Sequence, residues 1–311
     1  MLFITENKLK RIIEESIRKF LSEGIDFDNE TLTVSYNPLH EDNVETSIVT
    51  NPTVDKNIVN GIEVWSIFKR KIGLRGDGNP LIYALKNEGG WHFKTEEDKK
   101  AVFNQINKVV EKFVSLHNAP ITVVIPTGNE LNNIIADIVK TKNNTTTILK
   151  GVIVKMTTEE VDDIVLNKDS EFRKYYGKNF NAAYHQLTKY FDTMDEKRNG
   201  TFSRHFVKDK EMRNVLNKTL KLSTDKYAEF ANKINGNDII LIDDTISRGQ
   251  TIIEACRIIN ESYAPKSITV LTLLSKLAWF LNKEKINFEI KKLKIIFAKL
   301  FDLARFLKTI K

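Results

Sequence analysis

The sequence predicts an α/β fold built on a parallel β-sheet. From residue 121 onward, short apolar runs rich in β-branched residues alternate with turns and amphipathic helical patterns. Strands this uniformly apolar are typical of a parallel sheet that helices cover on both faces. The 311 residues, 41% apolar and 29% charged, suffice for a folded core. In such sheets, ligands bind beyond the carboxyl ends of the strands.

The N-terminal residues 1–118 are predicted to form an α+β extension. An amphipathic helix is expected over 6–22, and strand-like pieces ("TLTVSY", "VETSIV", "IEVWSIF") follow between breakers. Pro80 starts a helix after the turn "RGDGNP". That turn is either part of an acceptor pocket or an ordinary helix start. The capping box "TEED" opens a further helix over 95–116.

Residues 119–275 are predicted to form the sheet core. Four strands are expected, at 121–126, 145–156, 238–242 and 267–274. We expect a helix after the first strand and another after the third. A long polar insertion, 157–236, separates the second and third strands, and insertions of this length are usually functional or disordered. Its part at 195–213 is rich in Lys, Arg and His but poor in apolar residues. We therefore expect it to bury little apolar surface and to be mobile without a ligand.

The tail at 276–311 is predicted to be basic and helical. It reads either as a packed helix pair or as a basic surface for a membrane or partner. The whole chain has 48 Lys and Arg against 41 Asp and Glu, a formal net charge of +7. This charge suits phosphorylated small substrates. It is also compatible with nucleic acid, which is not favoured because the lysines are widely spread.

Cys256 is the only cysteine, which excludes an internal disulfide and a multi-cysteine metal site and suits a reducing compartment. It shares a helical stripe with Ile252 and Ile259, so we predict a buried, unreactive thiol. No apolar run reaches the roughly 18 residues of a membrane span, and the N-terminus does not resemble a signal peptide. We therefore expect a cytoplasmic protein without a membrane span.

The stretch "DIILIDDTISRGQTI", 238–252, carries the clearest chemistry. Asp243 and Asp244 end an apolar strand, where two carboxylates can accept hydrogen bonds from neighbouring ribose hydroxyls and lie near a hydrated Mg²⁺. The small polar residues that follow include Gly249 and lead into a helix, whose first N–H groups form an anion site. The stretch predicts a ligand that carries both a diol and a phosphate.

Residues 239–251 resemble the 5-phosphoribosyl-1-pyrophosphate (PRPP) motif of type I phosphoribosyltransferases, with four apolar residues, two acids, small polar residues, Gly and a final Thr. Thr245 departs from it, because many members are apolar there. The resemblance covers about 120–275. It implies the type I phosphoribosyltransferase core, with Mg²⁺ at Asp243 and Asp244. It implies PRPP binding by Asp243, Asp244, Thr245, Ile246, Ser247, Arg248, Gly249, Gln250 and Thr251.

The loop is most similar to the transferase half of glutamine PRPP amidotransferase, although the chain has no glutaminase part. By this resemblance, Thr127, Gly128, Asn129 and Lys155 would bind pyrophosphate. Arg204, with His205 and Lys208, would belong to a closing lid. The expected catalytic residues are Asp243, Asp244, Arg204 and Lys155. Plain surface roles stay open for Lys155 and for the lid residues.

The resemblance implies transfer of ribose 5-phosphate from PRPP, with Mg²⁺ as cofactor, to a small nitrogenous acceptor, releasing pyrophosphate. Ser247 argues against hypoxanthine and guanine, because the enzymes for those bases usually carry an acid at that position. The alternative is a PRPP-sensing, non-catalytic regulatory protein of the same fold, although residues 1–75 show no helix-turn-helix pattern. A homodimer is compatible with either interpretation.

Overall fold

The structure is a computed structural model that describes residues 24–37, 44–59, 61–70, 79–127, 129–246 and 249–275. The expected helix at 6–22, most of the "RGDGNP" turn and the tail at 276–311 lie outside the described residues. Within the described part, none of the helices is long and apolar enough to cross a membrane.

The described residues belong to two compact units. The first takes in those within 1–55, 68–105 and 274–311, and the second those within 56–67 and 106–273. Strand β5 (Ile62–Arg70) and helix α3 (Glu96–Leu116) run from one unit into the other. The boundaries after residues 118 and 275 stay sequence-based predictions.

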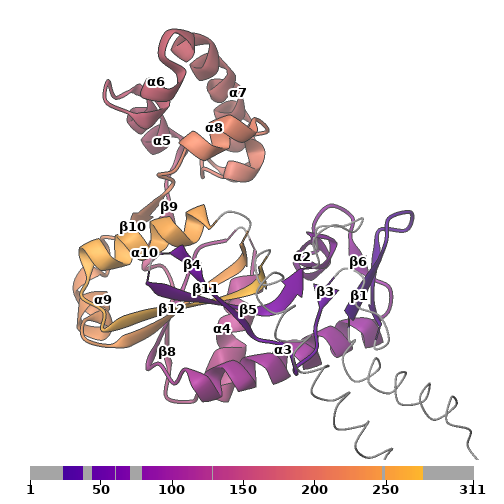
Figure 1. The fold of residues 1–311 in the computed structure, drawn as a ribbon. Coiled ribbons are helices and arrows are strands. Elements are labelled where there is room, and N and C mark those ends of the chain that lie inside the picture. Colours follow the sequence, from indigo (N-terminus) through magenta and orange to yellow (C-terminus); the bar gives the residue numbers. More distant parts are fainter. Residues whose placement is uncertain are drawn as a thin grey trace, which may run out of the picture. The chain divides into compact units, whose positions relative to one another are not determined.

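The second unit is an α/β layer structure around a mostly parallel sheet. Its strand order is β5-β12-β11-β7-β8, with β4 beside β5 (Figure 1). The other strands of this unit's sheet are β4 (Thr53–Val59), β7 (Ile121–Val124), β8 (Thr147–Leu149), β11 (Asp238–Ile246) and β12 (Ser267–Ser275). Strand β7 pairs in parallel with both β11 and β8. The predicted α/β class and parallel pairing are therefore confirmed.

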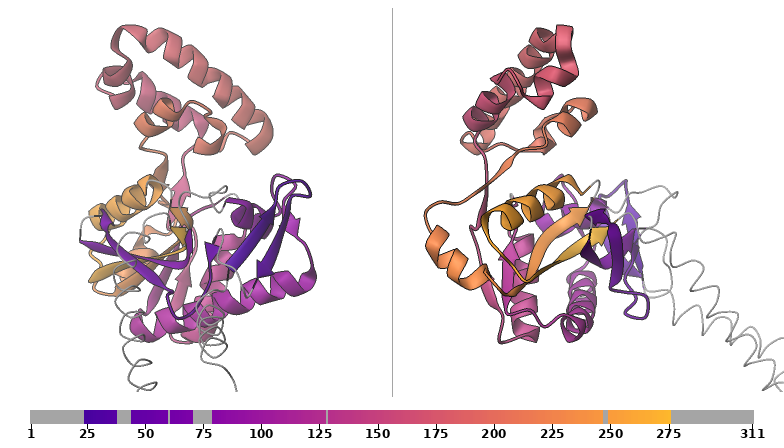
Figure 2. Two further views of the ribbon diagram at one scale, coloured as in Figure 1. Left: turned by 45° about the vertical axis from the view of Figure 1, so that its right-hand side comes forward. Right: turned by 60° about the vertical axis from the view of Figure 1, so that its left-hand side comes forward.

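Helices cover both faces of this sheet (Figures 1 and 2). On one face, α9 (Tyr227–Ile234) and α10 (Gln250–Ser262) share a core with the β11 residues Ile239 and Leu241. Ile240 and Ile242 alternate with them and are fully buried as well. On the other face, α4 (Leu131–Lys142) packs against β7 and β11. The helices predicted after "ITVVIP" and after "DIILI" are thus confirmed.

The predicted single strand over 145–156 is wrong. Strand β8 ends at Leu149, and Gly151 follows with φ 76°, a left-handed conformation that breaks the extended backbone. Strand β9 (Ile153–Lys155) instead pairs antiparallel with β10 (Leu220–Leu222) in a separate two-stranded sheet. This two-stranded ribbon connects the sheet core to the chain segment that follows β9 and precedes β10 (Figure 2).

Residues 157–219, hereafter the helical insertion, form a small helical cluster. Its helices are α5 (Thr158–Leu166), α6 (Glu171–Tyr176), α7 (Phe180–Arg198) and α8 (Lys210–Val215), with 3-10 turns at Gly177–Asn179 and Arg204–Phe206. Leu187, Met194 and Phe202 are among the buried residues of its own hydrophobic core. The expectation that 195–213 buries little apolar surface is therefore wrong, because Phe202, Val207 and Met212 are almost fully buried.

The first unit combines helices and strands in its described part. Its strands run in the order β6-β2-β1-β3-β5. Besides β5, they are β1 (Gly24–Asp28), β2 (Thr33–Asn37), β3 (Val44–Glu45) and β6 (His92–Phe93). Helix α2 (Asn79–Lys86) lies between β5 and β6 in the chain. The predicted cap of α3 is present, since the Asp98 N–H donates to Thr95 Oγ1 at 3.0 Å.

Candidate functional site

The carboxyl ends of β7 and β11 lie side by side at a reversal of strand order. From β7 the chain moves through α4 to β8 on one side, whereas β11 lies on the other side with β12 beyond it. Val124 pairs with Ile242, and the Ile125 N–H donates to Ile242 O at 3.0 Å. Such switch points are where open α/β sheets bind ligands.

A buried amide holds these two strand ends together. Asn132, at the start of α4, donates from Nδ2 to Ile125 O at 2.9 Å and reaches Ile242 O at 3.4 Å. Its side chain is almost completely buried. The loops that follow β7 and β11 therefore start from a defined, shared position.

A pocket of about 400 Å³ opens beside the end of β11. One wall comes from the PRPP-like motif and consists of Asp243, Thr245, Gly249, Gln250, Thr251 and Ile252. The other wall comes from the helical insertion and consists of Arg204, Lys210, Arg213 and Asn214. Three cationic side chains thus face one carboxylate, so the pocket favours an anionic ligand.

The two acids of the motif do not take equivalent positions. Strand β11 continues to Ile246, beyond the predicted end at 242, so both acids lie inside the strand. Successive side chains of a strand point to opposite faces, which places Asp243 with Thr245 and turns Asp244 the other way. Asp243 lines the pocket, and it is the only acid among the described lining residues. Both acids are buried, with 4% and 8% of their surface exposed.

The start of α10 presents backbone donors to the pocket. Gly249 precedes the helix with φ 75° and ψ 1°, a conformation that favours glycine, and no side chain caps the helix there. The first intrahelical bond runs from Ile253 N–H to Gly249 O at 2.8 Å. The N–H groups of Gln250, Thr251 and Ile252 therefore have no partner within the helix, the arrangement that binds phosphate at helix N-termini. Ser247 and Arg248 lie outside the described residues.

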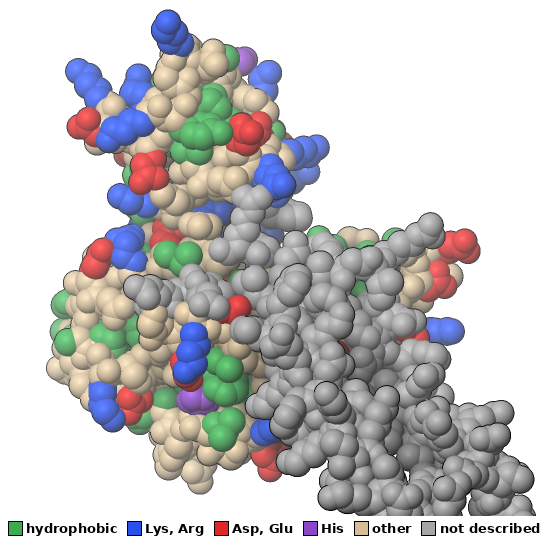
Figure 3. Space-filling model, in the orientation of Figure 1, with side chains coloured by type: hydrophobic (Ala, Val, Ile, Leu, Met, Phe, Trp, Pro, Cys, Tyr) green, Lys and Arg blue, Asp and Glu red, His purple; other side chains and the backbone are tan. Residues whose placement is uncertain are grey.

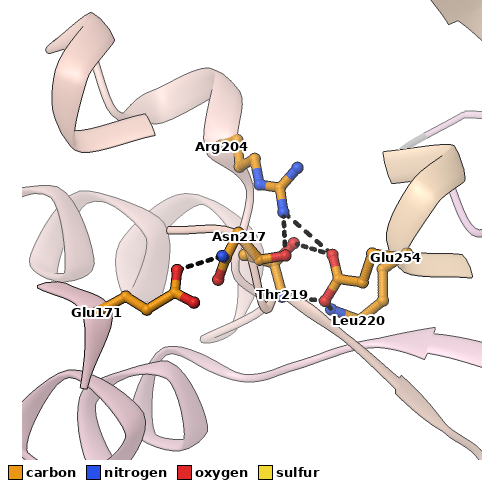
Figure 4. Close-up of polar contacts among 6 residues, drawn as sticks. All are labelled: Glu171, Arg204, Asn217, Thr219, Leu220 and Glu254. Carbon is orange, nitrogen blue, oxygen red and sulfur yellow. Dashed lines mark hydrogen bonds and ion pairs between the residues drawn. The ribbon is translucent and has the colours of Figure 1, made fainter. Parts of the chain in front are cut away.

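A buried ion pair fastens the helical insertion to α10 (Figure 4). Arg204 Nη2 donates to Glu254 Oε2 at 3.0 Å and to Asn217 O at 2.8 Å. Glu254 Oε1 accepts the backbone N–H groups of Thr219 at 2.5 Å and Leu220 at 2.8 Å. One carboxylate therefore binds both the cation that lines the pocket and the point where the insertion rejoins β10.

Burial and the bonded partners shift the pKa values of this pair in opposite directions. Burial raises the pKa of Glu254, while the Leu220 and Thr219 N–H groups and Arg204 oppose that rise. Burial likewise lowers the pKa of Arg204, and Glu254 opposes it. Each charge is stabilised by the other in a site from which water is largely excluded, since the Glu254 side chain is only 3% exposed.

Glu254 was not among the residues predicted from the sequence. A signal for it exists, because it is the one acid within the otherwise apolar run 252–256, between Ile253 and Ala255. Such an acid is buried only with partners. Its partners lie 34 to 50 positions away in the chain, where no local pattern indicates them.

The predicted pyrophosphate residues hold their own turn together or lie elsewhere. Thr127 Oγ1 donates to Asn129 O at 2.7 Å, and Asn129 Oδ1 accepts the Leu131 N–H at 3.1 Å. Neither lines the pocket, and Gly128 lies outside the described residues. Lys155 was expected to end a core strand. It lies instead in the β9–β10 ribbon, paired with Leu220, and does not line the pocket.

Two further predictions concern single side chains. Lys208 lies outside the pocket lining, and the side chain of His205 is outside the described residues. Cys256 is 2% exposed, which confirms the predicted burial. Burial raises the pKa of its thiol to about 12.

Comparison with known proteins does not identify the chain further. No family model matches it, and a search of curated proteins finds no match. The fold and the pocket define the class on their own: an α/β protein with a pocket, lined by three basic residues and one acid, at the carboxyl end of β11.

Proposed function

We propose that this chain is a phosphoribosyltransferase with the type I core, which binds PRPP and transfers ribose 5-phosphate to a small nitrogenous acceptor. The observation that carries the proposal is the pocket itself. The motif that resembles a PRPP loop forms one wall, and three cations from a separate part of the chain form the other. A diol acceptor, a backbone anion site and added positive charge are the groups that PRPP requires.

Each part of PRPP has a suitable partner in this pocket. The N–H groups at the start of α10 suit the 5′-phosphate, and the Asp243 carboxylate suits the ribose hydroxyls. Lys210 and Arg213 suit the pyrophosphate, whose negative charge grows as the bond to C1 breaks. Catalysis would then consist of positioning the two reactants and stabilising the leaving group, without a covalent enzyme intermediate.

The residues fit a Mg²⁺ ion that arrives with the substrate. Among the described residues, no cluster of three or more His, Cys, Asp or Glu side chains could hold a metal ion. Mg²⁺ commonly keeps several waters and binds through one or two carboxylates together with substrate phosphates. Asp243 could supply such a carboxylate at the pocket wall, and the ion would neutralise phosphate charge.

Calorimetry with PRPP and Mg²⁺, followed by pyrophosphate release with a panel of nitrogenous bases, tests the proposal. We expect binding that is lost in Asp243→Asn/Asp244→Asn. The control is Asp238→Asn at the opposite end of β11, where the carboxylate binds Lys266 and Ser267 at the surface. Unchanged affinity in the double variant would refute the site. Binding without pyrophosphate release from any base would favour the PRPP-sensing regulator instead.

A further inference from the structure

A second hollow, of about 500 Å³, lies on the helical insertion, and we call it the lysine groove. It is lined by Lys189, Tyr190, Thr193 and Lys197 of α7 and by Phe206 and Lys208. It shares no lining residue with the pocket at β11. The two hollows are therefore separate surfaces, although residues 204–210 contribute to both.

The groove combines positive charge with partly exposed aromatic rings. Its three lysines are exposed, whereas Tyr190 and Phe206 are half-buried. Tyr190 accepts a hydrogen bond from Gln186 Nε2 at 3.3 Å, and the Arg198 guanidinium lies 5.5 Å from the centre of the Phe206 ring. The rings are thus held by neighbours, yet each keeps surface at the groove.

No carboxylate lines the groove among the described residues, although acids are close in the sequence. Asp195 accepts a hydrogen bond from Thr158 Oγ1 at 2.6 Å. Asp209 caps α8 by accepting the N–H groups of Glu211 and Met212, both at 2.8 Å. These two acids are engaged in holding the insertion together, and the exposed acids Asp192 and Glu196 of α7 do not line the groove.

We propose that the lysine groove binds single-stranded nucleic acid. Aromatic rings on which bases stack, flanked by cations that follow the phosphates, are the usual means of binding a single strand without sequence preference. Lys189 and Lys197 stand about 12 Å apart along α7, at about 1.5 Å per residue. Cations spread over that length suit successive phosphates of a strand better than the one phosphate group of a free nucleotide.

A duplex fits these groups less well, because its bases are paired and stacked on one another. The hydroxyls at the groove, on Tyr190 and Thr193, are too few to read base edges. We therefore expect binding that tolerates sequence, depends strongly on salt and prefers single strands.

Fluorescence anisotropy with a labelled single strand of about twelve nucleotides tests the proposal on the full chain. The groove variant is Lys189→Glu/Lys197→Glu/Lys208→Glu. Basic side chains lie on several sides of the insertion (Figure 3), which offers a matched control. That control is Lys168→Glu/Lys174→Glu/Lys178→Glu, with the same charge change at three exposed lysines of the insertion.

We expect the groove variant to bind at least about tenfold more weakly than the control variant at low salt. The slope of log affinity against log salt should also fall by about 2, since each phosphate contact contributes about 0.7. Tyr190→Leu should weaken binding equally for different base compositions and leave the salt slope unchanged, because it removes stacking and keeps the charge. Thermal unfolding of each variant checks that it is folded.

Three results would overturn the proposal. The first is equal weakening in the groove and control variants, which would mean nonspecific attraction to positive charge. The second is equal affinity for a duplex of the same length. The third is displacement of the strand by adenosine triphosphate at matched concentration, which would make the groove a site for a free nucleotide.

Discussion

The two walls of the pocket at β11 are built in different ways. The wall from β11 and α10 combines Asp243 and Thr245, on a strand paired within the central sheet, with a helix start that presents N–H groups. The wall from the helical insertion consists of Asn214 and three long cationic side chains, Arg204, Lys210 and Arg213, on a 3-10 turn and a six-residue helix. The first wall is positioned by the core, and the second depends on the packing of a separate small cluster.

This difference suggests that the two walls bind different parts of a substrate. Backbone donors at a helix start cannot turn away from a ligand, so the core wall suits the part of a substrate that is held throughout a reaction. Lys210 and Arg213, on a separately packed element, suit a group that gains charge and then leaves. Glu254 links the two walls, because it binds Arg204 on one side and belongs to α10 on the other (Figure 4).

The largest effect is expected from breaking that link. Glu254→Ala leaves the Arg204 guanidinium and two backbone N–H groups without their acceptor, and breaking a buried pair in this way costs about 3–5 kcal/mol of unfolding free energy. Urea denaturation measures it. The control is Glu261→Ala on the same helix, whose exposed carboxylate pairs with Arg257 and contributes little. Equal stabilities for the two variants would contradict the network.

A second prediction separates the two acids of the motif. Asp243→Asn should weaken PRPP binding by about ten- to a hundredfold, since a charged acceptor of a ligand hydrogen bond contributes about 1.5–3 kcal/mol. Asp244→Asn should weaken it less, because that side chain points away from the pocket lining. Calorimetry in the presence of Mg²⁺ gives both affinities. A larger loss of PRPP affinity in Asp244→Asn would show that Asp244 contributes more to binding than Asp243.

A third prediction addresses the wall from the insertion. Arg213→Ala should lower kcat for pyrophosphate release by about tenfold and leave PRPP affinity closer to wild type, because its partner gains charge toward the transition state. Steady-state kinetics together with direct binding separate the two effects. Arg257→Ala, at an exposed arginine of α10 outside the pocket, serves as the control. If only affinity fell, Arg213 would bind the ground state alone.

The smallest effect is expected at Cys256, inside the core wall. Its pKa is raised to about 12 from 9.0, so the folded protein keeps the thiol protonated where a free thiol ionises. This contribution to stability is fully present below pH 9 and is lost only as the pH rises toward 12. Labelling by a thiol reagent between about pH 7 and 9 should stay slow and require unfolding. Fast labelling that follows thiol ionisation would show that α10 opens readily.

Much of the core wall could be predicted from the sequence because its signals are local. The apolar run before Asp243, the glycine at 249 and the helical stripe through Cys256 each act within one or two turns of chain. The same holds for the capping box at Thr95, where the cap oxygen and the Asp98 N–H that donates to it are three residues apart. Apolar residues that recur with a period of 2 in a strand or 3.6 in a helix indicate which side of the element is buried. The sheet core requires that each element bury one side.

The tertiary structure alone decided how far β11 extends and which acid lines the pocket, since both depend on pairing and alternation through Ile246. It also decided that the insertion folds around its own core and supplies cations to a site that begins 30 or more residues further along the chain. The reason is physical. Arg204 and Glu254 can be buried because they bind each other and because Glu254 also binds the backbone N–H groups of Thr219 and Leu220. These partners are so far apart in the chain that no periodic pattern in the sequence indicates them.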